Sequence, residues 1–312
     1  MDVLFCAKYA GYYYDPDVWS RALADLVPGL RLIVWPRPHD PTAIEMVIAD
    51  WAPPGLFASL PNLRCVLYPG YGPDALVASG EVPAHVTLAR LEDDGIARQM
   101  AEYVVLYVLH HHRAVEAYAA QQRAGHWGLV ETPTTDATTV GFMGLGRLGS
   151  AFAAALRSFG FRLAAWTRTA RDSDGITMFH GEDGLRAFLG EADYVVATLP
   201  STPATRDLMD ARRFGWFKTG AVFMNLGRGD LLVAADLIAA LDSGRLGGAV
   251  LDVHRPSPLP AESPLWHHPK VIVTPHSSGA KMGDAIPEVA RVCRLVAAGS
   301  PPPRVIDQSR GY

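Results

Sequence analysis

The chain has 312 residues, of which 49% are hydrophobic and 19% charged, and this predicts a globular protein of two domains rather than one. Its formal net charge of −4 and its lack of a basic run exclude an electrostatic nucleic-acid surface, and no stretch reaches the roughly 18 uninterrupted apolar residues of a membrane span. Three cysteines without metal-type spacing, and a first segment (Met1–Asp17) without signal-peptide features, predict a cytoplasmic protein without disulfides.

The first hundred residues alternate short apolar runs with polar helical stretches. The runs that we predict to be buried strands are Val3–Ala7, Leu32–Trp35, Met46–Ala49, Cys65–Tyr68 and Val86–Ala89. Strands that alternate with helices predict a parallel sheet. One long helix is then expected from Ile96 to Gln122, because this stretch contains neither Gly nor Pro.

Three consecutive histidines in the expected long helix, His110, His111 and His112, invite interpretation as metal ligands. Consecutive helical residues point about 100° apart, so these three side chains cannot converge on one ion. We therefore expect no metal site in this protein.

A second alternating block runs from Thr139 to about His276. Its predicted strands are Val140–Met143, Leu163–Trp166, Tyr194–Leu199, Ala221–Leu226, Ala249–Val253 and Val271–Thr274. Six strands with intervening helices are typical of the doubly wound parallel sheet, or Rossmann fold, that binds dinucleotides. A last helical segment, Asp284–Gly299, is expected to pack on the first domain. We predict a flavodoxin-like α/β substrate domain of residues 1–97 with 285–312, and a Rossmann domain of residues 98–284.

The pattern G-x-G-x-x-G occurs at Gly144, Gly146 and Gly149, between a predicted strand and a predicted helix. The glycines permit a tight turn, close approach of a pyrophosphate, and close packing of the helix on the strand. The helix N-terminus at Arg147 and Leu148 supplies N–H groups for phosphate. The alternative is that the glycines serve only to pack the helix.

The end of the next predicted strand indicates which dinucleotide binds. Where an NAD site carries an acid for the ribose 2′-hydroxyl, the chain has Thr167, Arg168 and Thr169. A hydroxyl and a guanidinium suit a 2′-phosphate, which favours NADP(H) and leaves NAD(H) possible. The alternative is that Arg168 and Arg171 occupy an exposed turn without a ligand.

Three later strands end in polar motifs at the carboxyl edge of the predicted sheet, where open α/β folds bind ligands. The motifs are Asn225-Leu226-Gly227-Arg228-Gly229-Asp230, Leu251-Asp252-Val253-His254-Arg255-Pro256-Ser257-Pro258-Leu259-Pro260 and Thr274-Pro275-His276-Ser277-Ser278-Gly279. Together with Arg90-Leu91-Glu92-Asp93, Glu262-Ser263-Pro264-Leu265-Trp266 and Arg310-Gly311-Tyr312, they resemble the D-isomer-specific 2-hydroxyacid dehydrogenase family. Within that family the glyoxylate/hydroxypyruvate reductase A group is most similar, and the likeness spans essentially the whole chain.

This resemblance implies an enzyme that reduces a small anionic 2-oxoacid, such as glyoxylate or hydroxypyruvate, with NADPH. It implies that Arg228 orients the substrate carboxylate, that His276 is the general acid, and that Asp252 fixes the nicotinamide carboxamide. It places Leu199 and Pro200 near the adenine side. Further cofactor contacts are expected at Leu226, Gly227 and Ser278. The alternatives are a surface ion pair for Arg228, a strand-end packing role for His276 and a turn role for Asp252.

The chain departs from the family pattern at Ser257, where a glutamate normally pairs with the catalytic histidine. A nearby opposite charge raises the pKa of a histidine by about 1–3 units, so we expect a lower pKa for His276 and count Ser257 within the catalytic set. Asp230 or Asp284 is a candidate to replace the missing carboxylate in space.

The substrate loop also departs from the pattern, since Gly70-Tyr71-Gly72-Pro73-Asp74 stands where the family has Gly-Ala-Gly-Val-Asp. The N–H groups of Tyr71 and Gly72 can still bind a carboxylate, but Pro73 removes the next donor. Trp51 resembles a substrate-side aromatic, with core packing as the alternative. In the Rossmann domain, Gly227 replaces a more common alanine, which would add room or flexibility.

Trp127 follows the expected long helix, in a region that packs across a two-fold homodimer in related enzymes. The ring is expected at that interface, in the neighbouring active site, or in the core. Two other functions stay open. One is an oxidoreductase of the same family with a redirected substrate. The other is a dinucleotide-binding regulator with a weakened catalytic set.

Overall fold

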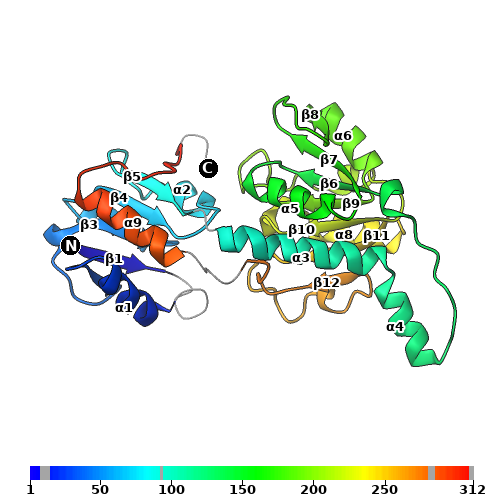
Figure 1. Cartoon of the computed structure of the whole chain (residues 1–312), viewed down its shortest axis with the longest axis horizontal. Helices are drawn as coiled ribbons and strands as arrows, with labels where there is room; N and C mark the ends of the chain where they lie inside the picture. The colour runs from blue at the N-terminus through cyan, green and yellow to red at the C-terminus, as the bar shows by residue number, and fades with distance from the viewer. Residues whose placement is uncertain (8–14, 92–93, 280–284, 309–312) are drawn as a thin grey trace. The chain divides into compact units, whose positions relative to one another are not determined.

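The computed structural model describes residues 1–7, 15–91, 94–279 and 285–308, and its contacts divide the chain into two units (Figure 1). The first unit comprises residues 1–96 and 280–312, and the second comprises residues 97–279. The boundary between residues 96 and 97 lies one residue before the predicted domain limit. The boundary between residues 279 and 280 lies five residues before the predicted one. The expected contributions of Asp284, Glu92, Asp93 and the closing Arg310-Gly311-Tyr312 lie outside the described residues.

The first unit contains a five-stranded parallel sheet in the order β2-β1-β3-β4-β5. Its strands are β1 (Asp2–Cys6), β2 (Arg31–Val34), β3 (Ile44–Ala49), β4 (Cys65–Tyr68) and β5 (Thr87–Arg90). Each of the five predicted runs is a strand, shifted at its ends by at most two residues. The strand order is that of the flavodoxin-like doubly wound sheet, so the predicted fold class of the first unit is confirmed.

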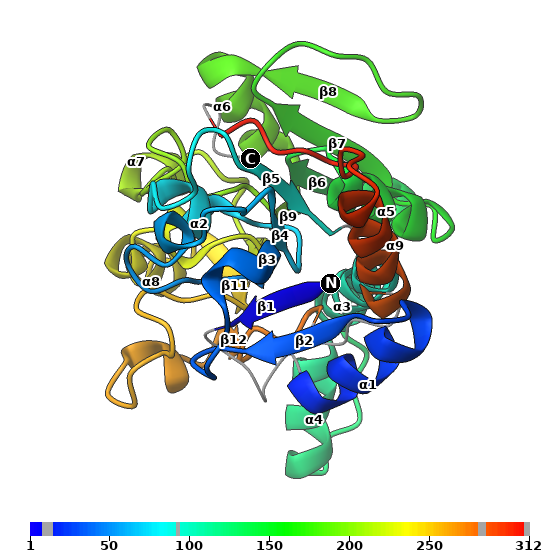
Figure 2. The ribbon, with the colours of Figure 1, turned by 90° about the vertical axis from the view of Figure 1, so that its left-hand side faces the viewer.

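Both faces of this sheet are buried, because alternate residues along each strand enter different apolar clusters. In β1, Val3 and Phe5 pack with one group of helices, whereas Leu4 and Cys6 pack on the opposite side. Figure 2 shows the sheet between these two layers. The covering helices are α1 (Pro16–Leu26) and α9 (Ala285–Ala297) on the first side and α2 (Asp74–Ala78) on the other.

The second unit contains a seven-stranded parallel sheet in the order β12-β11-β10-β9-β6-β7-β8. Its strands are β6 (Thr139–Met143), β7 (Arg162–Thr167), β8 (Thr177–His180), β9 (Tyr194–Ala197), β10 (Ala221–Asn225), β11 (Leu246–Leu251) and β12 (Val271–Val273). The order reverses between β6 and β9, as in a Rossmann sheet, and this confirms the predicted fold class. The prediction missed β8, an edge strand without a fully buried residue.

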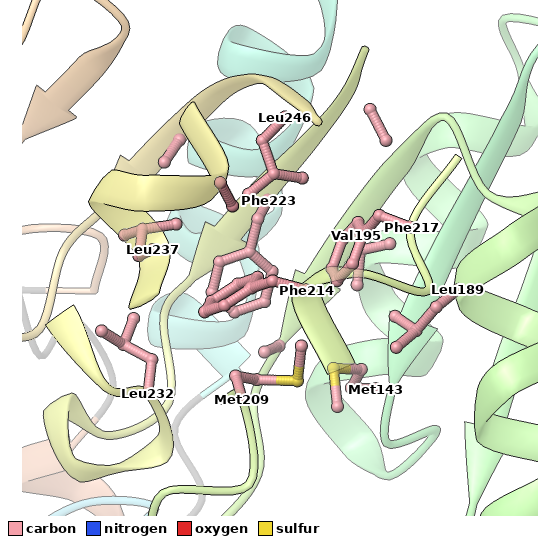
Figure 3. Close-up of a cluster of buried hydrophobic side chains, with 14 of the residues drawn as sticks. Met143, Leu189, Val195, Met209, Phe214, Phe217, Phe223, Leu232, Leu237 and Leu246 are labelled. Carbon is pink, nitrogen blue, oxygen red and sulfur yellow. The ribbon is translucent and has the colours of Figure 1, made fainter. Parts of the chain in front are cut away.

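Helices cover both faces of the second sheet. One face carries the large apolar cluster of Figure 3, in which Phe214, Phe217 and Phe223 pack ring to ring within 6 Å. The helices of this face are α6 (Gly181–Glu191), α7 (Ala211–Phe214) and α8 (Ala234–Asp242). The opposite face carries α5 (Arg147–Arg157), whose Phe152 packs against Phe142 of β6.

The expectation of one helix from Ile96 to Gln122 is wrong. The structure has α3 (Asp94–His112) and α4 (Val115–Ala124), separated at Ala114, which has φ +50°. This left-handed conformation costs an alanine roughly 1–2 kcal/mol and carries no Gly or Pro signal in the sequence.

The three histidines at the end of α3 face different neighbours. His111 contacts Gly248 of β11, His112 packs against Phe161 and Tyr194, and His110 lies 3.4 Å from a carboxylate oxygen of Glu116. Among the described residues, no helix is long and apolar enough to span a membrane, and no group of His, Cys, Asp or Glu is arranged to hold a metal ion.

Candidate active site

The glycine-rich turn between β6 and α5 has the geometry of a phosphate-binding loop. Gly144 has φ +98°, which favours glycine, and a methyl group at position 149 would lie 2.3 Å from the carbonyl oxygen of Gly144. Gly146 precedes the first turn of α5, and a methyl group there would face open space. The N-cap residue of α5 is Gly146, which has no side chain that could cap the first N–H groups of the helix.

The end of β7 supplies hydroxyl and guanidinium groups. The Thr167 hydroxyl donates to the carbonyl oxygen of Thr169 at 2.9 Å, and Arg168 is exposed. Nη1 of Arg171 donates to the carbonyl oxygen of Leu145, within the glycine-rich turn, at 2.9 Å. Arg171 is therefore attached to the turn, although the residue itself is exposed.

The end of β10 places Arg228 through a buried asparagine. Asn225 is fully buried; its Nδ2 donates to the carbonyl oxygen of Arg228 at 2.8 Å, and its Oδ1 accepts the N–H of Gly227 at 3.2 Å. A methyl group at position 227 would lie 2.7 Å from the carbonyl oxygen of Leu199. Glycine at 227 therefore adds no room, contrary to expectation, because the backbone of Leu199 occupies that space.

Asp252, directly after β11, holds the loop that carries His276. The carboxylate is fully buried and accepts three hydrogen bonds: from the Thr274 hydroxyl at 2.6 Å, from Ser277 N–H at 2.7 Å and from Ser278 N–H at 3.0 Å. Each donor comes from the segment that follows β12. Asp252 is thus more than an isolated turn residue, because it fixes the backbone on both sides of His276.

His276 adopts the left-handed conformation with φ +58°. This conformation is uncommon for a residue with a side chain and costs on the order of 1–3 kcal/mol, so the surrounding hydrogen bonds must enforce it. The residue keeps an exposed surface, yet burial by neighbouring groups is the main cause that lowers the pKa of its imidazole. The Asp252 carboxylate raises this pKa, whereas Arg228 and His254 lower it further.

The structure brings Arg228, Asp252 and His276 to one edge of the second sheet, at the ends of β10, β11 and β12. The candidate Asp284 lies outside the described residues. Ser257 is exposed in the loop after β11. The Asp230 carboxylate, a proposed replacement, accepts from the Ser201 hydroxyl and lies 3.5 Å from Arg206. Among the described residues, the Asp252 carboxylate acts on His276 and raises its pKa. The net direction is a lowered pKa, as expected, and its first cause is burial.

The expected substrate-side residues belong to the first unit. Trp51 follows β3 and is 43% exposed, so a large part of its ring surface is open to solvent in this unit. The carbonyl oxygen of Tyr71 accepts from Nη1 of Arg90 at 3.3 Å, and Pro73 immediately precedes α2, so the Tyr71–Gly72 loop is anchored at both ends.

Sequence reasoning missed several residues that build this site. Asn225 was visible as a polar residue at the end of an apolar run, and Thr274 as the residue before Pro-His. Tyr103 of α3 gave no local signal, because its hydroxyl lies 2.6 Å from the Thr274 hydroxyl across 171 positions of sequence.

The family model described as D-isomer specific 2-hydroxyacid dehydrogenase, NAD binding domain, matches residues 105–278. This match covers more than half of the chain and includes the strand ends of the second unit that are described above. The chain therefore belongs to the D-isomer specific 2-hydroxyacid dehydrogenases, a family of NAD(P)-dependent enzymes.

Solved structures of this family are similar over the whole chain. A D-isomer specific 2-hydroxyacid dehydrogenase from Xanthobacter autotrophicus Py2, in complex with NADPH and MES, is 37% identical, with 99% of each chain covered and a TM-score of 0.90. The NADPH-dependent glyoxylate/hydroxypyruvate reductase from Sinorhizobium meliloti, in complex with NADP and sulfate, is 34% identical, covers 100% of this chain and 99% of its own, and has a TM-score of 0.90. A probable 2-hydroxyacid dehydrogenase from Rhizobium etli CFN 42, in complex with NADP, HEPES and L(+)-tartaric acid, is 31% identical, with 99% of each chain covered and a TM-score of 0.89.

Proposed function

We propose that this protein is an NADPH-dependent reductase of small 2-oxoacids of the glyoxylate or hydroxypyruvate type. The observation that carries the proposal is the placement of Arg228 and His276 on one edge of a Rossmann sheet whose glycine-rich turn fits a dinucleotide. Family membership and two NADP-bound relatives of the same length support it.

The cofactor side is supported by the fit of the glycine-rich turn. Gly146 leaves space for a pyrophosphate, and the N–H groups of Arg147 and Leu148 at the start of α5 would bind it. A 2′-phosphate would contact the hydroxyl and guanidinium groups at the end of β7, which favours NADP(H) over NAD(H). The remaining proposed cofactor contacts are Gly144, Gly149, Thr167, Arg168, Thr169, Leu199, Pro200, Leu226, Gly227, Asp252 and Ser278.

The chain's own residues would bind the oxoacid and supply its proton. The bound dinucleotide supplies a hydride for the carbonyl carbon. Arg228 would orient the substrate carboxylate through its planar set of donors, and His276 would protonate the carbonyl oxygen. Ser257 belongs to this set as the residue that stands where the family pattern has a glutamate.

We assign the first unit to substrate binding and the second to cofactor binding. The anchored loop at Tyr71 and Gly72 can present backbone N–H groups to an anion, and the exposed ring of Trp51 can contact the body of the substrate. The Rossmann order of the second sheet supports its cofactor role.

The test is the oxidation of NADPH, with NADH in parallel, across a panel of 2-oxoacids that includes glyoxylate and hydroxypyruvate. We expect turnover with NADPH and these two acids. An Arg228→Lys variant should raise KM for the oxoacid, because a lysine cannot form the same two parallel hydrogen bonds. If NADPH binds without turnover of any member of the panel, the reductase proposal is wrong for these substrates.

Binding of NADPH without turnover of these oxoacids would favour an oxidoreductase of the same family that acts on a different substrate. Ser257, Tyr71 and Pro73 all depart from the family pattern, and all three belong to residues that we assign to substrate or proton transfer. A panel of larger oxoacids and other small anions would then identify the substrate class.

We further propose a homodimer that works in the cytoplasm. The described part of α4 has no buried residue, and the following loop exposes Trp127 and Leu129 almost completely. A second copy of the chain would cover this surface. The three cysteines are free and buried, which is consistent with a reducing compartment.

A further inference from the structure

Thr274 is the most completely bonded residue of the candidate site. Its N–H donates to Leu251 O at 3.0 Å, and its carbonyl oxygen accepts from Nε2 of His254 at 3.0 Å. Its hydroxyl donates to Oδ1 of Asp252 at 2.6 Å and lies 2.6 Å from the Tyr103 hydroxyl. Every polar group of Thr274 therefore has a partner.

The number of available protons determines which group donates in the Thr274–Asp252 and Tyr103–Thr274 hydrogen bonds. A threonine hydroxyl has one proton, and an ionised carboxylate can only accept, so the proton of Thr274 points to Asp252. Tyr103 must then donate to the Thr274 oxygen. Burial raises the pKa of the Tyr103 phenol above its usual range, so the phenol keeps the proton that it donates.

The same carboxylate also holds the residues after His276. Asp252 accepts from Ser277 N–H and Ser278 N–H, as well as from Thr274. The segment from Thr274 to Ser278 is thus fixed at both ends to one buried group, with His276 between the two attachments. A left-handed residue at 276 is what turns the following N–H groups toward the carboxylate.

We propose that Thr274 positions His276 for proton transfer, and that Tyr103 and His254 are positioning residues that act through Thr274. This inference rests on the proposed reductase function. Tyr103 attaches the loop to α3, and His254 attaches it to the segment after β11. Neither residue needs to touch substrate or cofactor in this role.

Tyr103 and His254 contact Thr274 through different groups: Tyr103 through its phenol hydroxyl and His254 through its imidazole. His254 donates through Nε2 to the carbonyl oxygen of Thr274, and its Nδ1 is buried with no hydrogen-bond partner among the described residues. Among the described residues, the charged and titratable groups that act on His276 include Asp252, Arg228 and His254. A shift of the loop changes the distances from His276 to all three, so loss of positioning alters the titration of His276 as well as the rate.

The test compares Thr274→Val, which keeps the shape and removes the hydroxyl, with Thr274→Ser, which keeps the hydroxyl. We expect Thr274→Val to lower kcat about tenfold or more with KM for NADPH changed less than about twofold, whereas Thr274→Ser stays within about threefold of wild type. Tyr103→Phe should lower kcat about fivefold. If Tyr103 acts through Thr274, the double variant Tyr103→Phe/Thr274→Val is no slower than Thr274→Val alone.

Additive losses in the double variant, or a Tyr103→Phe variant with the wild-type kcat and pH profile, would overturn the proposal. An NMR titration of the His276 imidazole gives a readout that needs no turnover. Its midpoint should move in Thr274→Val and return in Thr274→Ser. If wild type reduces no oxoacid, the reductase function fails while this titration still decides the positioning role. An unmoved midpoint in Thr274→Val overturns that role.

Discussion

Among the described residues, burial, Arg228 and His254 oppose the Asp252 carboxylate in setting the protonation of His276. Burial of the ring disfavours the imidazolium, and the interactions with Arg228 and His254 act in the same direction. The Asp252 carboxylate opposes them but is already engaged by three donors. The result is a pKa below the ordinary value of a histidine.

This balance predicts the pH dependence of the reaction. The reduction that we propose needs His276 in its protonated form, so kcat/KM for the oxoacid should be highest at low pH and fall as the pH rises through the lowered pKa. We expect an apparent pKa below about 6.5, the usual value of a free histidine. The measurement is kcat/KM from pH 4.5 to 8.5, and a midpoint above that value would contradict the expectation.

A carboxylate introduced at position 257 should shift the profile. In Ser257→Glu, a negative charge near His276 would stabilise the imidazolium and raise its pKa, on the order of 1 unit if the charge comes within several ångströms. Ser257→Gln is the matched control, since it has the same size without the charge. A midpoint that is equal in both variants would show that position 257 does not face His276.

At the scale of the element, substitutions at two positions of the glycine-rich turn should differ in their effects on protein stability and on NADPH binding. Gly149→Ala places a methyl group 2.3 Å from a backbone oxygen, so the turn or α5 must move, and we expect a lower Tm together with loss of NADPH binding. Gly146→Ala meets no neighbouring atom and has an ordinary φ of −77°. It should keep the wild-type Tm while weakening NADPH binding by about tenfold or more, because its methyl group occupies the space left for a phosphate. Calorimetry and fluorescence titration measure the two effects, and an equal Tm loss in both variants would contradict this explanation.

The end of β7 should determine the choice between the two nicotinamide cofactors. Thr167→Asp places a carboxylate where it can accept from a ribose 2′-hydroxyl and repel a 2′-phosphate. The ratio of kcat/KM for NADPH to that for NADH should fall by about tenfold or more. Thr167→Asn is the control without charge, and an unchanged ratio in Thr167→Asp would indicate that the 2′ position binds elsewhere.

The elements with a strong local pattern were predictable from the sequence. Buried parallel strands are short apolar runs, and the glycine-rich turn has fixed spacing, so both were located to within a few residues. The break at Ala114 was not, because alanine gives no signal for a left-handed conformation. The edge strand β8 was missed because its residues are only partly buried.

The connections within the site were also beyond sequence reasoning. Arg228, Asp252 and His276 stand in recognisable motifs, so each could be named. The hydroxyl contact between Tyr103 and Thr274 and the close approach of Gly227 to Leu199 depend on how distant segments pack. No local pattern encodes such contacts, and the significance of Thr274 emerged only from its partners.

At the scale of the whole molecule, α4 is difficult to explain in an isolated chain. It has ten residues, none of them buried, and helices shorter than about 12 residues are marginal in water without packing. The loop that follows has Trp127 at 101% and Leu129 at 89% exposure. Figure 1 shows this helix and loop extending away from the sheet of the second unit. Such a surface is typical of a region covered by another chain.

A homodimer through this surface predicts a change in mass. Wild type should elute as a dimer in size-exclusion chromatography with light scattering, and Trp127→Ala/Leu129→Ser should shift it toward the monomer, because these two side chains provide most of the exposed apolar surface of the loop. Phe159→Ser, at an exposed apolar residue outside this surface, is the control and should stay dimeric. If the double variant stays dimeric but loses kcat/KM, Trp127 acts at the neighbouring active site rather than in holding the copies together. A monomeric wild type would leave α4 to be stabilised by something other than a second copy.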